Sequence, residues 1–287
     1  MVWVNAIVQG ILVGGLYALF ATGLSLVFGV MRLVNLAHGD FAILGAYGAV
    51  FATDHFGVGP WVAFLLIVPA MALVGFVLQT TVLNFTLDSG LAPLLATFGL
   101  AIVIQNSLLE GFSPNVQGLD AGSIETSSIT ITNQLSIGWF PLITLLAAVV
   151  LLVGLQLLIR LTGFGRALRA TADDQRAAQL VGIDNRRMYG IAMAISLATA
   201  AIAGIFLGIR TTFDPGAGPV RLIFAFEAVI IGGLGSLWGT LAGGIVLGVA
   251  QAIGDQLNPG WGVLAGHLVF LAVLLVRPTG LFGRQAA

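Results

Sequence analysis

Long apolar tracts constrain the fold of this chain more than any other feature. They lie at about 3–30, 36–53, 60–83, 91–109, 138–160, 188–210, 222–254 and 261–276. A helix needs about 20 apolar residues to cross a bilayer, and a barrel strand needs only about half as many. Only 8% of the residues are charged, against about 25% in soluble domains. The sequence therefore predicts an all-α, polytopic transmembrane helical bundle that occupies residues 1–287 as a single domain.

The seventh tract is too long for one crossing. Gly232, Gly233, Gly235 and Gly239 lie near its middle, where glycine weakens a helix. We expect two shorter segments there, which gives nine crossings, or eight if the tract is continuous. Four crossings precede the tract at 138 and four follow the charged loop after it. This arrangement predicts an inverted repeat around a central helix, as in many transporters.

The arginines predict the orientation of the chain. Six of the 11 basic residues lie between Arg160 and Arg187, and short cytoplasmic loops carry the excess of positive charge. The loop 161–187 is therefore expected in the cytoplasm, with the N-terminus and residues 110–137 outside. Arg210 and Arg221 fall on the outer side, against the rule. Residues 123–132 are β-branched and partly alternating, which predicts a short hairpin or strand on the outer surface.

Glycines recur at four-residue spacing in several tracts. Such spacing places them on one helix face, where they let two helices approach closely. The residues are Gly10, Gly14, Gly204, Gly208, Gly235, Gly239, Gly243, Gly244 and Gly248. Close packing is the simpler interpretation. Irregular backbone is also tolerated at membrane depth where it lines a cavity, so the segment 232–239 is a candidate for the translocation path.

The charged loop is expected to contain a short helix from about Ala167 to Leu180, ended by Gly182 in a left-handed conformation. Charged side chains recur on it at three- and four-residue steps, and small alanines offer a surface for close packing. This pattern predicts a surface that meets a soluble partner. The alternative is a solvated loop that lies near anionic lipid.

Three stretches resemble hallmarks of a known family. Residues 176–183 resemble the Glu-Ala-Ala-x-x-x-Gly coupling motif of ABC importer permeases, with Arg176 where that motif has Glu. Residues 33–47 contain Asn-Leu-Ala-His-Gly-Asp, which is similar to a signature of LivH-type branched-chain amino acid permeases. Residues 165–170 and 232–239 match further stretches of the same LivH/LivM family, in the same order.

The resemblance implies a type II-like permease of an ABC importer in the inner or plasma membrane of a prokaryote. It implies two cytoplasmic ABC ATPases that hold ATP and Mg, a second related permease and an extracytoplasmic binding protein. Transport would proceed by alternating access. Branched-chain amino acids are the expected substrates, and urea or short amides are the alternative. The residues expected to contact the ATPase are Arg166, Arg169, Asp173, Asp174, Arg176, Ala177, Ala178 and Gly182.

Other function classes find little support in the sequence. The chain has no lysine, so it cannot form a phosphate-binding Gly-x-x-x-x-Gly-Lys loop. It has no cysteine, and its three histidines lie far apart without metal-ligand spacing. No basic run with aromatic residues suggests nucleic acid. We therefore expect a subunit without enzyme activity that binds no cofactor, metal or nucleic acid, in contact with the lipid bilayer.

Polar residues inside apolar tracts are candidates for function because they are costly in a membrane. The candidates for the translocation path are Asn35, His38, Asp40, Glu227, Gly235 and Gly239. Solvation at the interface, or a pairing with Arg32, is an equal alternative for the first three. Glu227 needs a partner, Gln105 and Asn106 are expected to link helices, and His267 is expected to be a packing histidine. An ion-coupled transporter stays open, although Asp40 and Glu227 are few and dispersed for an ion site.

Overall fold

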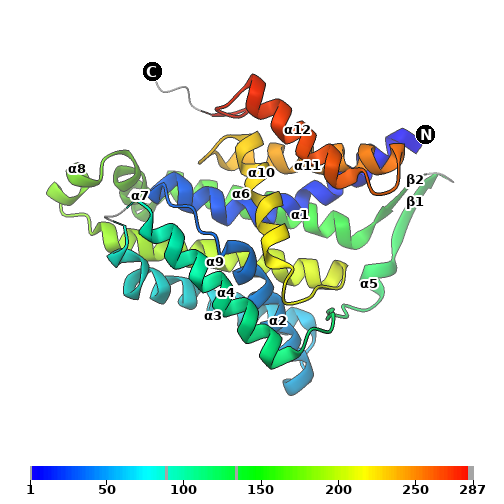
Figure 1. Cartoon of the computed structure of the whole chain (residues 1–287), viewed down its shortest axis with the longest axis horizontal. Helices are drawn as coiled ribbons and strands as arrows, with labels where there is room; N and C mark the ends of the chain where they lie inside the picture. Colours follow the sequence, from blue (N-terminus) through cyan, green and yellow to red (C-terminus); the bar gives the residue numbers. More distant parts are fainter. Residues whose placement is uncertain (1, 88–89, 133–134, 284–287) are drawn as a thin grey trace.

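The computed structural model describes residues 2–87, 90–132 and 135–283, which form a helical bundle with one small sheet (Figure 1). The all-α class is therefore confirmed. The elements are α1 (Val2–Met31), α2 (His38–Phe56), α3 (Pro60–Thr81), η1 (Leu83–Phe85), α4 (Ala92–Phe112), α5 (Ser123–Thr126), β1 (Ser128–Thr132), β2 (Leu135–Gly138), α6 (Trp139–Leu161), α7 (Gly163–Asp173), α8 (Gln175–Leu180), α9 (Asn185–Arg210), α10 (Gly218–Gly232), α11 (Leu237–Leu257) and α12 (Gly262–Val276).

Within the described residues, six helices are long and apolar enough to cross a membrane: α1, α3 with η1, α4, α6, α9 and α11. The remaining helices of the bundle are shorter, with 19 residues in α2 and 15 each in α10 and α12. The predicted break in the seventh tract is confirmed, because Gly233 and Gly235 adopt positive φ angles between α10 and α11. However, α10 begins at Gly218, four residues before the predicted tract.

Helices α2 and α10 begin inside the bundle instead of at its ends. Residues 32–37 are non-helical and return along α1, so that His38 Nε2 lies 2.9 Å from the carbonyl oxygen of Phe20. Residues 211–217 precede α10 in a similar way. The two helix starts touch, since a Cβ on Gly39 would lie 2.1 Å from the carbonyl oxygen of Gly218. The nine crossings stay a prediction, because six of the described helices are long and apolar enough to span a membrane and α2, α10 and α12 are not among them.

The helix pairing supports the predicted inverted repeat. Helix α1, the first of the N-terminal half, packs along α11, the third helix of the C-terminal half, and α9 packs along α3 in the same way. Glycines make the first contact, because Cβ atoms on Gly10 and Gly14 would lie 2.6 and 2.5 Å from backbone atoms of α11. Helices α1 and α9 are the most buried of the spans, and α3, α4 and α6 expose aliphatic side chains on the outside. The bundle therefore has an inner layer around α1 and α9 and an apolar outer surface.

The two polar parts of the chain lie at opposite ends of the bundle. Figure 1 shows α7 and α8 at one end and strands β1 and β2 at the other. The strands pair antiparallel, with Ser128 opposite Gly138. The predicted hairpin is therefore confirmed from Ser128 onward, whereas the first predicted residues, Ser123–Thr126, form helix α5. This separation agrees with a basic loop on the inner side and a hairpin on the outer side.

Candidate functional site

The chain turns sharply from α6 into α7, and a glycine makes the turn feasible. A Cβ on Gly165 would lie 2.2 Å from the carbonyl oxygen of Ile159. The hydroxyl of Thr162 caps α7 by accepting a hydrogen bond from the Gly165 amide at 3.0 Å. Arg169 also donates to the carbonyl of Ile159. These contacts hold α7 against the end of α6.

The predicted single helix from Ala167 to Leu180 is wrong, because Asp174 divides it into α7 and α8. Asp174 has an extended backbone with φ of −149°. Its carboxylate accepts hydrogen bonds from the amides of Arg176 at 2.8 Å and Ala177 at 3.0 Å. An aspartate that caps a helix competes with continuation of the preceding helix. The charged residues before and after Asp174 therefore do not share one helix face.

The α7–α8 unit is anchored to the start of α9. Asn185 accepts a hydrogen bond from the Thr171 hydroxyl at 3.2 Å and donates one to the Gln175 carbonyl at 2.8 Å. Gly182 has a φ of +86° and ends α8, as predicted. The amide of Ile183 then donates to the Ala178 carbonyl, which completes a Schellman motif. The α7–α8 unit is thus folded and is held at one end by α6 and at the other by α9.

The outward surface of the unit combines charge with exposed aliphatic groups. Leu180 is 89% exposed and Val181 is 76% exposed. Sequence reasoning did not single out this pair as a contact. The exposed residues around them are Arg166, Arg169, Asp173, Asp174, Arg176, Ala177 and Gly182, whereas Ala178 is buried within the unit. Adjacent exposed aliphatic side chains with arginines are typical of a protein interface.

At the other candidate site, Asn35 and His38 are buried where the non-helical segment meets α2. The Asn35 side chain accepts a hydrogen bond from the Ala37 amide at 3.0 Å, and its amide nitrogen lies 4.0 Å from the sulfur of Met193 in α9. His38 contacts the Phe20 carbonyl of α1 through Nε2, and its Nδ1 has no hydrogen-bond partner among the described residues. These side chains therefore hold the start of α2 between α1 and α9.

Asp40 extends the same junction to α4 and α10. Gln105 of α4 donates to its carboxylate at 2.8 Å, and a Cβ on Gly218 would lie 2.0 Å from its Oδ1. The alternative of solvation or a pairing with Arg32 is wrong, since Asp40 is 1% exposed and bonds to Gln105. Gln105 links two helices as expected. Asn106 does not, because it bonds to the Ile102 carbonyl in its own helix.

Glu227 lies further along α10 and pairs with His267 of α12. Its side chain is 5% exposed, whereas that of His267 is 39% exposed. The His267 ring also stacks on Phe224, with centroids 6.3 Å apart. The predicted need of Glu227 for a partner is confirmed.

Gly235 lies in the turn between α10 and α11, and Gly239 lies in the first turn of α11. A Cβ on Gly239 would lie 2.2 Å from the Gly232 carbonyl oxygen, and one on Gly235 would lie 3.2 Å from Gly29 of α1. The six candidates for the translocation path thus occupy three places: the start of α2, the middle of α10 and the α10–α11 turn.

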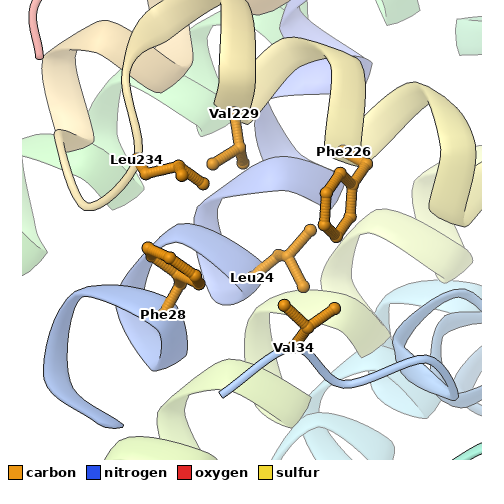
Figure 2. A pocket seen from close by; sticks show the side chains of 6 residues that line it. All are labelled: Leu24, Phe28, Val34, Phe226, Val229 and Leu234. Carbon is orange, nitrogen blue, oxygen red and sulfur yellow. The ribbon is translucent and has the colours of Figure 1, made fainter. Parts of the chain in front are cut away.

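A small apolar pocket is lined by residues next to Asn35, Glu227 and Gly235 in the sequence, and sequence reasoning missed it. Figure 2 shows its six side chains, which come from α1, the non-helical segment before α2, α10 and the turn after it. They are Leu24, Phe28, Val34, Phe226, Val229 and Leu234. Every side chain that lines the pocket is hydrophobic, so none of them can form a hydrogen bond with a ligand. Within the described residues, no group of His, Cys, Asp and Glu side chains could hold a metal ion.

Comparison of the sequence with known proteins assigns the chain to one family. Residues 6–276 match the profile of the family described as branched-chain amino acid transport system / permease component. The permease protein BraD of Pseudomonas aeruginosa is 29% identical, over 98% of this chain and 96% of its own length. LivH of Salmonella typhimurium is 31% identical, over 96% of this chain and 94% of its own. LivM of Escherichia coli is 27% identical, over 93% of this chain and 67% of its own.

Proposed function

Because the chain belongs to the family of permease components of branched-chain amino acid transport systems, we propose that it is the membrane-spanning subunit of an ABC importer. Its cargo is a branched-chain amino acid, and its location is the cytoplasmic membrane of a prokaryote. The two most similar relatives described above are named as high-affinity branched-chain amino acid permeases. The chain crosses the membrane many times, as a permease requires.

The α7–α8 unit is the observation in the structure that carries the proposal. A permease without a phosphate-binding loop depends on ATP hydrolysis by another chain. That chain needs a contact surface on the permease through which its movement is transmitted. Two large aliphatic side chains, Leu180 and Val181, are exposed beside charged groups at the end of the bundle opposite the hairpin. The bonds of Asn185 tie the unit to α9. Force applied to the unit is thereby transmitted to one of the two innermost helices.

Two ABC ATPases that hold ATP and Mg are the proposed partners at this surface. Residues Arg166, Arg169, Asp173 and Arg176 make the polar contacts, and Ala177 lets the ATPase approach closely. Asp174 caps the start of α8 and Gly182 sets its end. The buried Ala178 supports the unit from within. A second permease completes the translocation path, and LivM-like proteins are related to this chain along most of its length. A binding protein delivers the amino acid at the hairpin end.

Alternating access requires a place where the bundle can bend. The starts of α2 and α10 meet inside the bundle, each after a non-helical segment. Asn35, His38 and Asp40 join these starts to α1, α4 and α9. We propose that the two halves rock about this junction while Gly235 and Gly239 keep the α10–α11 turn close-packed.

Uptake by the reconstituted complex tests the proposal. The permease, its partner permease, the ATPases and the binding protein are placed in proteoliposomes with internal ATP, and uptake of radiolabelled leucine is measured. ATP-dependent uptake of leucine that isoleucine and valine inhibit supports the assignment. Uptake of urea or a short amide without uptake of leucine would contradict the branched-chain amino acid as substrate and identify the alternative one. Uptake driven by an ion gradient without ATP would contradict an ABC importer.

A further inference from the structure

A polar groove of about 460 Å³ lies between α1 and α11 at the hairpin end of the bundle. Asn5, Gln9 and Asp255 line it with partly or fully exposed side chains, and Tyr17 and Gln251 line it with buried ones. The Gln9 side chain donates to the Ser136 carbonyl of β2 at 2.8 Å, which places the mouth of the groove beside the hairpin. Polar side chains of this number are not suited to contact with lipid. The groove therefore faces water or a partner subunit.

Tyr17 and Gln251 belong to a buried polar cluster. The Tyr17 hydroxyl donates to Gln251, and the Tyr17 ring packs on Phe224 with centroids 5.2 Å apart. Tyr17 also interacts electrostatically with Arg221, Arg210 and Glu227. The cluster therefore combines two cationic groups and one acidic group near the same phenol.

Several polar atoms of this cluster have no partner within the described residues. They are Nη1 of Arg210, Nε of Arg221, Oε2 of Glu227 and Nε2 of Gln251, all buried. Neither guanidinium forms an ion pair with a carboxylate of the described chain. Buried donors and acceptors in folded proteins nearly always have partners. The cluster thus has unpartnered donors for an anion and an unpartnered acceptor for a cation. Its members Tyr17 and Gln251 also line the groove.

We propose that this cluster binds the charged end of a zwitterionic amino acid on its way through the permease. Arg210 and Arg221 bind the α-carboxylate, Glu227 binds the α-ammonium group, and the groove between α1 and α11 is the entrance. The assignment rests on the proposed transport function and identifies its substrate site. It also explains why two arginines lie toward the outer side, against the charge rule for membrane proteins.

Substitution of the charged groups in the reconstituted complex tests the assignment. Arg221→Gln and Glu227→Gln should each lower the rate of leucine uptake by about tenfold, the effect of losing a hydrogen bond between charged groups. Assembly of the complex and stimulation of ATP hydrolysis by the binding protein should persist. The exposed Arg277→Gln variant is the matched control and should transport at the wild-type rate. Unchanged uptake in both cluster variants would overturn the assignment.

A cysteine test does not depend on the folding of those variants. The chain has no cysteine, so Ala252→Cys places one thiol in the groove wall. A membrane-impermeant thiol reagent added from outside should label this chain and block uptake. Leu268→Cys on the exposed surface of α12 is the control, and the same reagent should leave its uptake unchanged. Labelling of Ala252→Cys without loss of uptake, or no labelling, would overturn the assignment.

The two proposals fail in different ways. If wild-type complex transports no amino acid, the proposed function fails and the substrate site with it. If wild-type complex transports leucine and the cluster and groove variants behave like it, only the substrate site is excluded.

Discussion

Single glycines determine how closely the helices of this bundle approach one another. A Cβ on Gly204 of α9 would lie 1.8 Å from the carbonyl oxygen of Ala42 in α2. The obstacle is backbone, which cannot move aside as a flexible side chain can. Gly99 of α4 is also helical, but beyond its own helix backbone no atom of the described residues lies within 4 Å of its Cβ position. Glycine is therefore required for close helix packing at position 204 and is not required for it at position 99.

Gly204→Ala should destabilise the protein by about 1–3 kcal/mol, the usual cost of overpacking, because α9 and α2 must separate. Gly99→Ala should be neutral or raise stability by up to about 1 kcal/mol, since alanine is the better helix former. Thermal unfolding of the two variants in the same detergent gives the comparison. Equal midpoints for both would contradict the close contact between α9 and α2.

At the scale of elements, the α7–α8 unit depends on one aspartate. The Asp174 carboxylate accepts two backbone hydrogen bonds at the start of α8. Helix α8 has only six residues, so it has little stability of its own. The cap and the bonds of Asn185 together keep the outward surface in place.

Asp174→Ala should cost about 1 kcal/mol at this cap and lower ATP hydrolysis stimulated by the loaded binding protein. Asp174→Asn should keep near wild-type stimulation, because asparagine caps a helix equally well. ATPase assays on the purified complex separate the two variants. If Asp174→Asn lowers the stimulated ATP hydrolysis as much as Asp174→Ala does, then coupling depends on the charge of Asp174 and not on its helix cap.

Local signals in the sequence predict some elements well and miss others. The glycines around 233 predict the break between α10 and α11, and Gly182 predicts the end of α8, since both rest on backbone geometry. The division of the predicted helix at Asp174 is missed because the sequence alone does not distinguish an aspartate that caps a new helix from an aspartate on the surface of a continuous one. The contacts of Asp40 and Glu227 are missed because Gln105 and His267 are distant in sequence.

At the scale of the molecule, the two halves interlock. The first helix of each half packs on the third helix of the other, and the starts of α2 and α10 meet inside the bundle. Burial of α1 and α9 leaves the apolar surfaces of α3, α4 and α6 on the outside. The charge pattern predicts a direction, with the α7–α8 unit inside the cell and the hairpin outside.

Single cysteines test this orientation. Val116→Cys, before the hairpin, should react with a membrane-impermeant maleimide in intact spheroplasts, since Val116 is 61% exposed. Ala177→Cys on α8 is also exposed but should react only after the membrane is opened. Labelling of Ala177→Cys from outside would show that the chain has the opposite orientation. It would also exclude α7–α8 as the contact with the ATPase.

The central claim is that α7–α8 couples this permease to ATPases on other chains. Its most direct test is the double variant Leu180→Asp/Val181→Asp, which places two charges at the exposed aliphatic pair. Tagged wild-type protein should co-purify with the ATPases and show ATP hydrolysis stimulated by the loaded binding protein. The double variant should reach the membrane with unchanged thermal stability and lose both. Retention of the ATPases and of stimulated hydrolysis in this variant would contradict the claim.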